Sequence, residues 1–334
     1  MFRGKKILIT GGTGSLGTAL TKKLLKTDVN AIRIFSRDEL KQTQMKQELD
    51  DKRLRFLIGD IRDKERLLRA LEDIDIVIHA AAMKQVPVVE YNPFEAVKTN
   101  VYGAQNLIEC CLDRNVEIAL GVGTDKAVSP FNTYGATKLL MERLFLSSNF
   151  YKGHHRTKLF CVRYGNVMGS RGSVIPLFVN QIKNNSKLTI TDPEMTRFNI
   201  TMDDALELIF RALKRGQGGE VFIPKLKAYK LGDVVDALIE LTDKKIIQEK
   251  IAVRPGEKYH ESLISSDEIR NVYETDEDYV LFEQITQGYD IQLNSDIKKS
   301  ELDNRYSSDR VSLLSKNEIK DLIIREGYLT NLNS

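Results

Sequence analysis

Closely spaced glycines follow the first apolar segment of the chain. Residues 5–10 are predicted as a buried strand, and Gly12, Gly14 and Gly17 then give the spacing G-x-G-x-x-G ahead of an apolar-periodic helix at 15–26. A glycine-rich turn between a strand and a helix brings backbone N–H groups close to a pyrophosphate, and the helix N-terminus adds its dipole. The start of the chain therefore predicts a dinucleotide-binding βαβ unit.

The alternation of strands and helices continues to about residue 163. Further strands are predicted at 31–35, 54–58, 75–79, 117–122 and 158–163, and helices at 38–49, 64–71, 93–114 and 132–149. Strands that alternate with helices imply a parallel sheet that is covered on both faces. We therefore predict an α/β fold built on a Rossmann-like, doubly wound parallel sheet.

The pattern loosens after Gly172, which marks the predicted domain boundary. Helices are predicted at 174–183, 202–214 and 231–241, and strands at 188–191 and 220–223. We assign residues 1–172 and about 199–230 to a dinucleotide-binding domain. Residues at about 173–198 and 231–334 would form a smaller C-terminal substrate-binding lobe and a tail.

Composition excludes several classes of protein. A formal net charge of +3 over 334 residues is too small for a nucleic-acid binder, whose affinity rests on phosphate neutralisation. Three cysteines without a C-x-x-C pair indicate reduced thiols in a cytoplasmic protein. The four histidines lack any ligand spacing, so no metal ion is expected. The apolar run at residues 7–9 is too short for a signal peptide, and no run reaches about 18 apolar residues, so no membrane association is expected.

The end of the second predicted strand bears on the choice of dinucleotide. NAD enzymes usually place an acid there for the ribose, whereas Ser36 and Arg37 suit a 2′-phosphate, and Lys41 lies one helical turn later. The alternative is structural, because Ser36 and Glu39 also fit a capping box for the next helix. The two interpretations are compatible, and we expect NADP as the cofactor.

Cofactor contacts are also expected after the third and fourth strands. Asp60 and Ile61 stand where adenine is commonly contacted, and the small residues 80–82 leave room for the central part of the cofactor. The complete predicted cofactor set is Gly11, Thr13, Gly14, Ser15, Leu16, Gly17, Ser36, Arg37, Asp38, Lys41, Asp60, Ile61, Ala80, Ala81, Ala82, Asn100, Tyr134, Lys138 and Val167.

Tyr134 and Lys138 stand four residues apart in a predicted helix and therefore share one of its faces. A phenol with a pKa of about 10 is a poor base. A neighbouring lysine and the positive nicotinamide ring would lower this pKa, so that Tyr134 can take the proton of an alcohol while hydride leaves for the cofactor. Thr124, just after the fifth strand, is placed to hydrogen-bond the same oxygen. Y-x-x-x-K alone is a common helix pattern, and its weight here comes from the glycine loop ahead of it.

Asp125 and Lys126 follow Thr124 and are not needed by a plain dehydrogenase. Once C4 of a sugar is a ketone, the C5 proton is acidified, and a base there with an acid near the C6 hydroxyl can expel water. Lysine serves as a base only if desolvation or nearby cations lower its pKa, which a cleft beside Lys138 would do. In an extended chain the side chains of Asp125 and Lys126 would point to opposite faces. The structural alternative is a surface ion pair at a strand end, and proximity to Tyr134 favours catalysis.

With these residues in place, the sequence resembles the extended short-chain dehydrogenases/reductases. It is most similar to the soluble, inverting UDP-N-acetylglucosamine 4,6-dehydratases of bacterial nonulosonic-acid and surface-glycan synthesis. The resemblance is carried by segments 7–15, 36–42, 79–84, 124–127, 134–138, 163–166, 169–173, 195–198 and 254–257, and the match beyond residue 265 is loose.

The resemblance implies oxidation at C4, loss of water across C5–C6, and return of the same hydride to C6 with inversion at C5, while NADP stays bound. It also implies Lys126 as the base, Asp125 as the acid, and Tyr134 with Lys138 as the redox pair. Retaining relatives bear Asp-Glu where this chain has Asp125 and Lys126, which is the main reason to expect inversion. Membrane-bound relatives have extra N-terminal spans that this chain lacks, and another soluble branch has methionine at the position of Tyr134.

Substrate contacts follow from the same resemblance. The residues implied around the UDP-sugar are Lys84, Asn166, Arg171, Arg197, Arg254 and Glu257, of which the arginines suit a diphosphate. Taken alone, Arg197 would be an exposed helix-start residue and 254–257 an ordinary turn. Gly123 departs from the family, which usually has serine there.

The sequence leaves three other functions open. A UDP-hexose 4-epimerase or a retaining 4,6-dehydratase would use the same fold, and an epimerase needs only Tyr134, Lys138 and the cofactor. A non-catalytic NADP sensor would not require the intact Tyr/Lys pair. The resemblance further implies a homo-oligomer.

Overall fold

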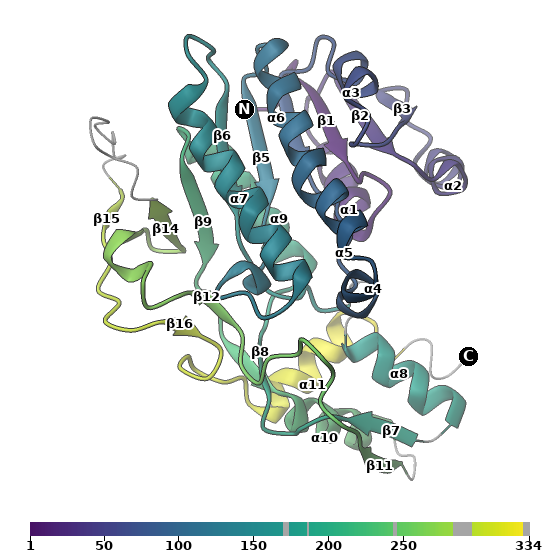
Figure 1. The fold of residues 1–334 in the computed structure, drawn as a ribbon. Helices are drawn as coiled ribbons and strands as arrows, with labels where there is room; N and C mark the ends of the chain where they lie inside the picture. The colour runs from purple at the N-terminus through teal and green to yellow at the C-terminus, as the bar shows by residue number, and fades with distance from the viewer. Residues whose placement is uncertain (170–173, 186, 243–245, 283–295, 330–334) are drawn as a thin grey trace.

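A ten-stranded, mostly parallel sheet forms the centre of the molecule (Figure 1). The structure is a computed structural model that describes residues 1–169, 174–185, 187–242, 246–282 and 296–329. In sheet order the strands are β3 (Leu54–Ile58), β2 (Ala31–Ser36), β1 (Lys6–Thr10), β4 (Ile76–His79), β5 (Ile118–Val122), β6 (Lys158–Val162), β9 (Glu220–Pro224), β14 (Asp278–Phe282), β13 (Val272–Glu274) and β15 (Lys298–Lys299). The strands from β3 to β9 run parallel, which confirms the predicted Rossmann-like sheet.

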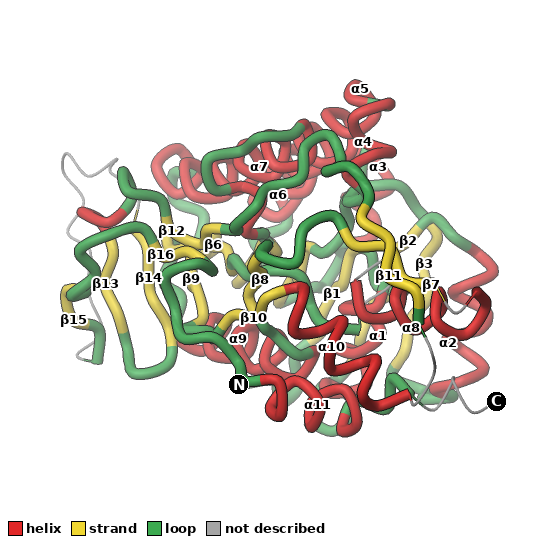
Figure 2. Tube along the Cα trace, turned by 90° about the horizontal axis from the view of Figure 1, so that it is seen from below, coloured by secondary structure: helices red, strands yellow, loops and turns green. Residues whose placement is uncertain are grey.

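Helices cover both faces of the sheet (Figure 2) because its strands are apolar on both sides. Leu8 of β1 packs into the core on one face, and its neighbours Ile7 and Ile9 pack into the core on the other. The first face carries α3 (Lys64–Ala70), α6 (Gly103–Asp113) and α7 (Thr133–Tyr151), and the second α1 (Ser15–Leu24), α2 (Glu39–Leu49) and α9 (Met202–Arg215). Among the described helices, none combines the length and the apolar character that a bilayer span requires.

The predicted helix at 93–114 is interrupted in the structure. α5 (Pro93–Ala96) is followed by a π-helical segment, Val97–Tyr102, and only then by α6, while a separate helix, α4 (Val86–Tyr91), precedes them. Pro93 starts α5 because its fixed φ and missing N–H suit a first helical turn. Short π-helical segments occur often at functional sites, and this one buries Asn100.

The smaller lobe has its own apolar core beyond the carboxyl ends of the parallel strands (Figure 1). Phe178, Leu188, Leu238 and Ile323 belong to this core. Its elements are α8 (Val174–Asn185), β7 (Lys187–Ile190), β8 (Thr196–Phe198), β10 (Ala228–Lys230), α10 (Leu231–Thr242), β11 (Ile247–Lys250) and α11 (Lys316–Arg325). A further antiparallel pair, β12 (Ser262–Ile264) with β16 (Tyr306–Ser307), lies close to the large sheet.

The C-terminal part of the chain also extends the large sheet, which we did not predict. β14 pairs antiparallel with β9, and β13 and β15 follow it. Residues 272–282 and 298–299 therefore lie in the sheet, whereas we had placed them in the smaller lobe. The strands escaped prediction because they are short, and because β14 pairs with a strand more than fifty residues away, a partner that local periodicity does not reveal.

Arg163 joins the sheet to the segment ahead of β13 through a buried ion network. It follows β6, and its guanidinium donates to the carboxylates of Glu142 in α7 at 2.7 Å and of Glu268 at 3.0 Å. It also donates to the carbonyl oxygen of Leu263 at 3.0 Å. The side chains of Arg163 and Glu142 are 2% and 1% exposed, so each charge depends on its partner in place of water.

Replacing Arg163 by methionine would leave the buried Glu142 without this counter-charge. Removing one partner of a buried ion pair costs about 3–5 kcal/mol, and we expect Arg163→Met to lower the free energy of unfolding by about that amount in urea denaturation. Arg163→Met combined with Glu142→Leu should recover most of the loss, because both members of the fully buried pair are then apolar and Glu268, whose side chain is 16% exposed, can reach water. Equal losses in the single and the double variant would contradict the pairing.

Candidate active site

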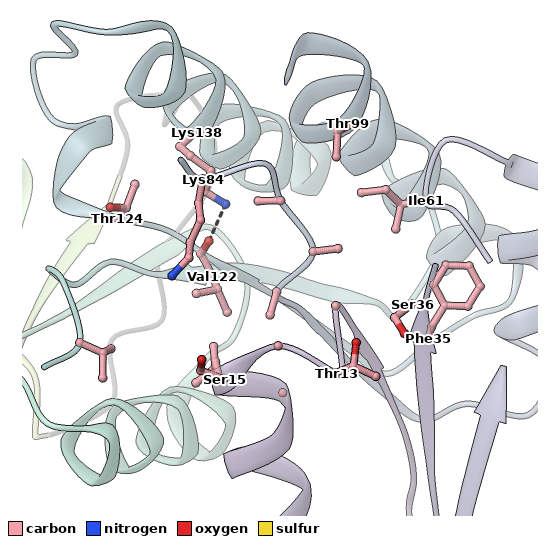
Figure 3. Close-up of a pocket in the computed structure, with 18 of the residues that line it drawn as sticks. Thr13, Ser15, Phe35, Ser36, Ile61, Lys84, Thr99, Val122, Thr124 and Lys138 are labelled. Atoms are coloured by element: carbon pink, nitrogen blue, oxygen red, sulfur yellow. Dashed lines mark hydrogen bonds between the residues drawn. The ribbon is translucent and has the colours of Figure 1, made fainter. Parts of the chain in front are cut away.

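A cavity of about 700 Å³ opens at the carboxyl ends of the parallel strands, where open α/β sheets bind ligands. All the residues predicted to hold the cofactor line it except Asn100. Lining residues outside the predicted sets include Gly59, Thr99, Tyr164, Gly165 and Met202. Figure 3 shows Thr124 and Lys138 at one end and Ser36 and Ile61 at the other, so the cavity suits an elongated ligand.

The glycine loop leaves no room for a side chain at two positions. Gly11 has a φ of +65°, and a Cβ there would lie 2.8 Å from the backbone nitrogen of Ala81. A Cβ on Gly17 would lie 2.5 Å from the Cα of Gly12. Gly14 is the N-cap of α1 and provides no side-chain cap, so the first N–H groups of the helix can turn to an anion. The loop therefore fits the pyrophosphate of a dinucleotide.

Helix α2 is capped by Asp38, and the predicted capping box at Ser36 is wrong. The Asp38 carboxylate accepts a hydrogen bond from the backbone N–H of Lys41 at 3.0 Å. Ser36 is instead the last residue of β2, and its Oγ accepts a hydrogen bond from Nε2 of Gln42 at 3.0 Å. Because β2 continues through Ser36, its hydroxyl remains at the cavity wall.

Two cations lie beside Ser36, each with an acidic partner. The Arg37 side chain is 61% exposed, and its Nη1 is 3.7 Å from Oδ2 of Asp60. Nζ of Lys41 is 2.6 Å from Oδ2 of Asp38. Such exposed pairs contribute little free energy, so either cation is able to turn toward a phosphate. This end of the cavity therefore suits a phosphorylated ribose.

Asn100 supports the cavity wall and does not line it. Its Oδ1 accepts from the backbone N–H of Met83 at 2.8 Å, and its Nδ2 donates to the carbonyl oxygen of Met83 at 3.0 Å and to Oγ1 of Thr137 at 3.0 Å. Asn100 thereby holds the loop after β4 against α7, and its predicted contact with the cofactor finds no support in this geometry. The same loop carries Lys84, a predicted substrate residue, which lines the cavity (Figure 3).

Tyr134 and Lys138 lie on one face of α7, and both line the cavity. The Thr124 hydroxyl donates to Oδ1 of Asp125 at 2.9 Å, and Nζ of Lys138 donates to the carbonyl oxygen of Val122 at 2.6 Å (Figure 3). Burial raises the pKa of Tyr134 to about 12, against the opposing charge of Lys126. Burial lowers the pKa of Lys138 to about 8. In the protein alone, burial of the phenol outweighs the positive charge of Lys126, and the lowering of this pKa by Lys138 and the nicotinamide ring stays a prediction.

Asp125 and Lys126 form a buried ion pair. They share a single 3-10 turn, Asp125–Ala127, which follows the extended residue Thr124. Nζ of Lys126 is 3.0 Å from Oδ1 of Asp125 and 3.1 Å from Oδ1 of Asn166. The side chains of Lys126 and Asp125 are 15% and 2% exposed, so the alternative of a surface ion pair is wrong. The expectation that the two side chains point to opposite faces is also wrong, because the turn brings them together.

The pKa of Lys126 is raised, although we expected a base with a lowered pKa. Burial lowers the pKa of Lys126, but the negative charges of Asp125 and Glu261 outweigh that effect. The pKa of Asp125 is raised by its burial, which the positive charge of Lys126 offsets only in part. A carboxyl group with a raised pKa suits the role of an acid that delivers a proton.

Glu261 is a third charged group of the site, and the sequence analysis missed it. Its Oε1 lies 3.5 Å from Nζ of Lys126, and the residue is 3% exposed. It directly precedes β12 and follows the predicted substrate residues Arg254 and Glu257 by a few positions. The only signal in the sequence was an acid immediately ahead of a short apolar strand.

A second cavity of about 150 Å³ shares Asn166 with the first. Arg197, Arg254 and Glu257 line it, so three predicted substrate residues lie together. Arg197 belongs to β8 and is 7% exposed, which corrects the alternative of an exposed helix start, and its Nη2 is 3.2 Å from Oε1 of Glu257. Arg171 lies outside the described residues. The roles of these side chains in substrate binding stay predictions.

The parallel sheet, the glycine loop and the Tyr134–Lys138 pair define an extended short-chain dehydrogenase/reductase. A family model described as Polysaccharide biosynthesis protein matches residues 7–283. The chain belongs to this family, which agrees with the resemblance read from the sequence.

Two of the relatives of the chain have names that state different activities. The chain is 45% identical to UDP-N-acetylglucosamine 4,6-dehydratase (inverting) of Campylobacter jejuni, over 97% of its own length and 98% of the relative. It is 40% identical to a protein of Rickettsia conorii named UDP-glucose 4-epimerase, over 98% of both chains. Among solved structures, Pen from Bacillus thuringiensis matches with a TM-score of 0.93 at 41% identity, which covers 98% of this chain and all of that one.

Gly123, which stands where the resembled family usually has serine, lies against the buried Glu142. A Cβ at this position would collide with the Glu142 carboxylate and lie 2.7 Å from the carbonyl oxygen of Val162. Arg163 holds Glu142 in place through three hydrogen bonds, so the carboxylate cannot move away freely. In this chain, therefore, position 123 has no space for a side chain as long as Glu142 keeps its buried position.

We expect Gly123→Ser to lower the free energy of unfolding by about 1–3 kcal/mol, the usual cost of forcing extra atoms into a packed interior. Urea denaturation measures the loss. Gly123→Ser combined with Glu142→Asp should be less destabilised than the sum of the two single variants, because the shorter carboxylate relieves part of the collision. Unchanged stability of Gly123→Ser would show that the site has room for the serine.

Proposed function

We propose that the chain is a UDP-N-acetylglucosamine 4,6-dehydratase that inverts C5 and gives a UDP-2-acetamido-2,6-dideoxy-L-hexos-4-ulose. One observation carries the proposal: the largely buried amine of Lys126 contacts Asp125 and also Asn166, which lines the cavity together with Tyr134. A C4 oxidation needs no second base beside Tyr134, whereas proton removal from C5 does, and Lys126 is placed to be that base. The name of the Campylobacter jejuni relative supports both the substrate and the stereochemical outcome.

We propose NADP as the cofactor, tightly bound and recycled. When bound, the nicotinamide would supply the hydride chemistry, as acceptor at C4 and donor at C6. The loop at residues 11–17 would hold the pyrophosphate on the N-terminus of α1. Ser36, Arg37 and Lys41 would hold the 2′-phosphate, because β2 ends in a serine where an NAD enzyme usually has an acid.

The side chains of the site would act in sequence. Tyr134 takes the proton of the C4 hydroxyl, and the Thr124 hydroxyl holds the same oxygen. Lys126 then removes the proton from C5, which the C4 ketone has acidified, and Asp125 protonates the C6 hydroxyl, which leaves as water. Return of a proton to the other face of C5 inverts this centre. The side chains proposed around the UDP-sugar are Lys84, Asn166, Arg171, Arg197, Arg254 and Glu257.

A UDP-hexose 4-epimerase is the second candidate, because the Rickettsia conorii relative is so named. Epimerisation at C4 would employ Tyr134 and Lys138 and would give the buried Asp125 and Lys126 no chemical role. A retaining dehydratase is a weaker candidate, because the retaining proteins that the sequence resembles have glutamate in place of Lys126. The dehydratase with inversion is therefore the function that the site supports best.

We propose a cytoplasmic homo-oligomer. The described part of the chain has three free cysteines, all buried, which suits a reducing compartment. Tyr91, Phe94 and Tyr102 are 89%, 80% and 57% exposed on the helical segments between residues 86 and 102, and a second copy of the chain would cover such an apolar surface.

Incubation with UDP-N-acetylglucosamine in deuterated water tests the proposed reaction. We expect proton NMR to show a new C6 methyl group, deuterium at C5 and an L-configured 4-keto sugar, without added cofactor. The Lys126→Glu variant should lose inversion at C5, because the amine that removes the C5 proton is gone. Lys22→Glu, on the exposed part of α1, is the matched control and should behave as the wild type.

Other products would decide against the proposal. A C4 epimer with its C6 hydroxyl intact would identify the epimerase, and no reaction in the presence of bound NADP would indicate a sensor. Inversion at the normal rate in Lys126→Glu would show that another group is the base.

The choice of NADP is tested with fragments of the cofactor. We expect protein stripped of dinucleotide to bind adenosine 2′,5′-bisphosphate more tightly than ADP in calorimetry, since Arg37 and Lys41 add charge-assisted hydrogen bonds to the 2′-phosphate. Each such bond is worth about 1.5–3 kcal/mol, so Arg37→Ala should remove about that much of the preference. Arg55→Ala, an exposed arginine on β3, is the control. Equal affinity for the two fragments would contradict the assignment.

A further inference from the structure

Two carboxylates approach the single amine of Lys126. Oδ1 of Asp125 is 3.0 Å from Nζ, and Oε1 of Glu261 is 3.5 Å from it. Asp125 and Glu261 are 1% and 3% exposed, so neither acid shares its charge with bulk water. Asp125 comes from the turn after β5, and Glu261 from the segment ahead of β12. The two acids therefore meet at Lys126 from distant parts of the chain.

Backbone hydrogen bonds hold Glu261 in this position. Its N–H donates to Oγ of Ser308 at 3.0 Å, and the N–H of Ser308 donates to its carbonyl oxygen at 2.8 Å. Within the described residues, Oε2 of Glu261 is buried and has no hydrogen-bond partner. A buried carboxylate oxygen without a partner is costly for the fold alone. The fold alone therefore does not explain the buried carboxylate of Glu261, whereas its contact with Lys126 does.

The charged groups around the pair keep Glu261 ionised. Burial raises the pKa of Glu261, but the positive charges of Lys126, Arg197 and Lys258 outweigh it and leave this pKa lowered. The other titratable groups that interact with Lys126 are the carboxylate of Asp125, the phenols of Tyr134 and Tyr229 and the ammonium group of Lys258. Asp125, whose pKa is raised, holds a proton more readily than Glu261 does.

We propose that Glu261 is a positioning residue that fixes the side chain of Lys126 and stabilises its protonated form when it has taken the C5 proton. The inference rests on the proposed dehydration. In that step the C5–H bond breaks, its proton goes to Nζ of Lys126, and its electron pair forms the C5=C6 double bond. The C6–O bond breaks, and the proton of Asp125 leaves with the hydroxyl as water. The negative charge of Glu261 then faces the new ammonium group.

Glu261→Gln tests the inference, because it keeps the size of the side chain and removes its charge. The measurement is NMR of nitrogen-labelled lysine at a pH equal to the ordinary lysine pKa of 10.5. Lys126 should be an ammonium group in the wild type, and its signal should shift toward that of the neutral amine in the variant. Loss of an anion at this distance lowers a lysine pKa by about 1–3 pH units. Lys126→Met identifies the resonance, and an unchanged signal in Glu261→Gln would overturn the inference.

A second readout separates the steps of the reaction. With UDP-N-acetylglucosamine, C4 oxidation should proceed in Glu261→Gln at close to the wild-type rate. Deuterium exchange at C5 should fall by about tenfold or more, the factor that one pKa unit represents. Reduced nicotinamide should then accumulate and be visible by its absorbance. A fall of both steps by the same factor would mean that Glu261 supports only the fold.

The controls distinguish three possible failures. Glu220→Gln removes another buried carboxylate, which accepts hydrogen bonds from the backbone of Gln217 and Gly218 away from the site, and it should change neither readout. If Glu261→Gln does not fold, Glu261→Asp should give a smaller pKa decrease in the same direction, and no decrease would overturn the inference. If the wild type forms no C6 methyl product, the proposed function fails, whereas the NMR titration still tests the charge contact.

Discussion

Three cations that lie where the two parts of the chain meet each pair with a glutamate. All three glutamates belong to one short segment, residues 257–268. The pairs are Arg197 with Glu257 at 3.2 Å, Lys126 with Glu261 at 3.5 Å and Arg163 with Glu268 at 3.0 Å. A buried charge that loses its partner is strongly destabilising, so this segment and the surfaces that carry the cations depend on each other. Glu257 of this segment also lines the second cavity, so a segment far from the glycine loop in sequence contributes to the site.

The same pairing reconciles a raised lysine pKa with the role of a base in the proposed reaction. The proton that Lys126 must lose need not go to water, because Asp125 lies 3.0 Å away and its own pKa is raised. One transfer along this hydrogen bond gives a neutral amine and a protonated carboxyl group together, which are the forms that the base and the acid require. The number of bound protons stays the same. Glu261 takes no part in this proton transfer, because the positive charges of Arg197 and Lys258 keep its carboxylate ionised.

Structural features that depend on neighbouring residues along the chain could be predicted from the sequence. Features that depend on contacts between distant residues could not. The glycine loop, the parallel strands and the Tyr134–Lys138 face follow from local spacing, and the structure places them as expected. We expected an extended segment at Asp125 and Lys126, but the structure has a single 3-10 turn there. A turn of this length leaves no periodic signal in the sequence. Glu261 and the strand position of Arg197 depend on pairings with β16 and β10, which no local pattern reveals. The raised pKa of Lys126 likewise required knowledge of Glu261.

The energetics of these buried charges favour dehydration over epimerisation. Moving an ion out of water costs several kcal/mol, and well-packed apolar residues often replace a buried ion pair without loss of stability. The fold alone thus has no need of Asp125, Lys126 and Glu261 beside the cavity. A reaction confined to C4 has no need of them either, because Tyr134, Thr124 and Lys138 suffice for proton and hydride movement there. Proton removal at C5 and loss of the C6 hydroxyl require a base and an acid on neighbouring carbons, and the turn at Asp125 and Lys126 provides two such groups side by side.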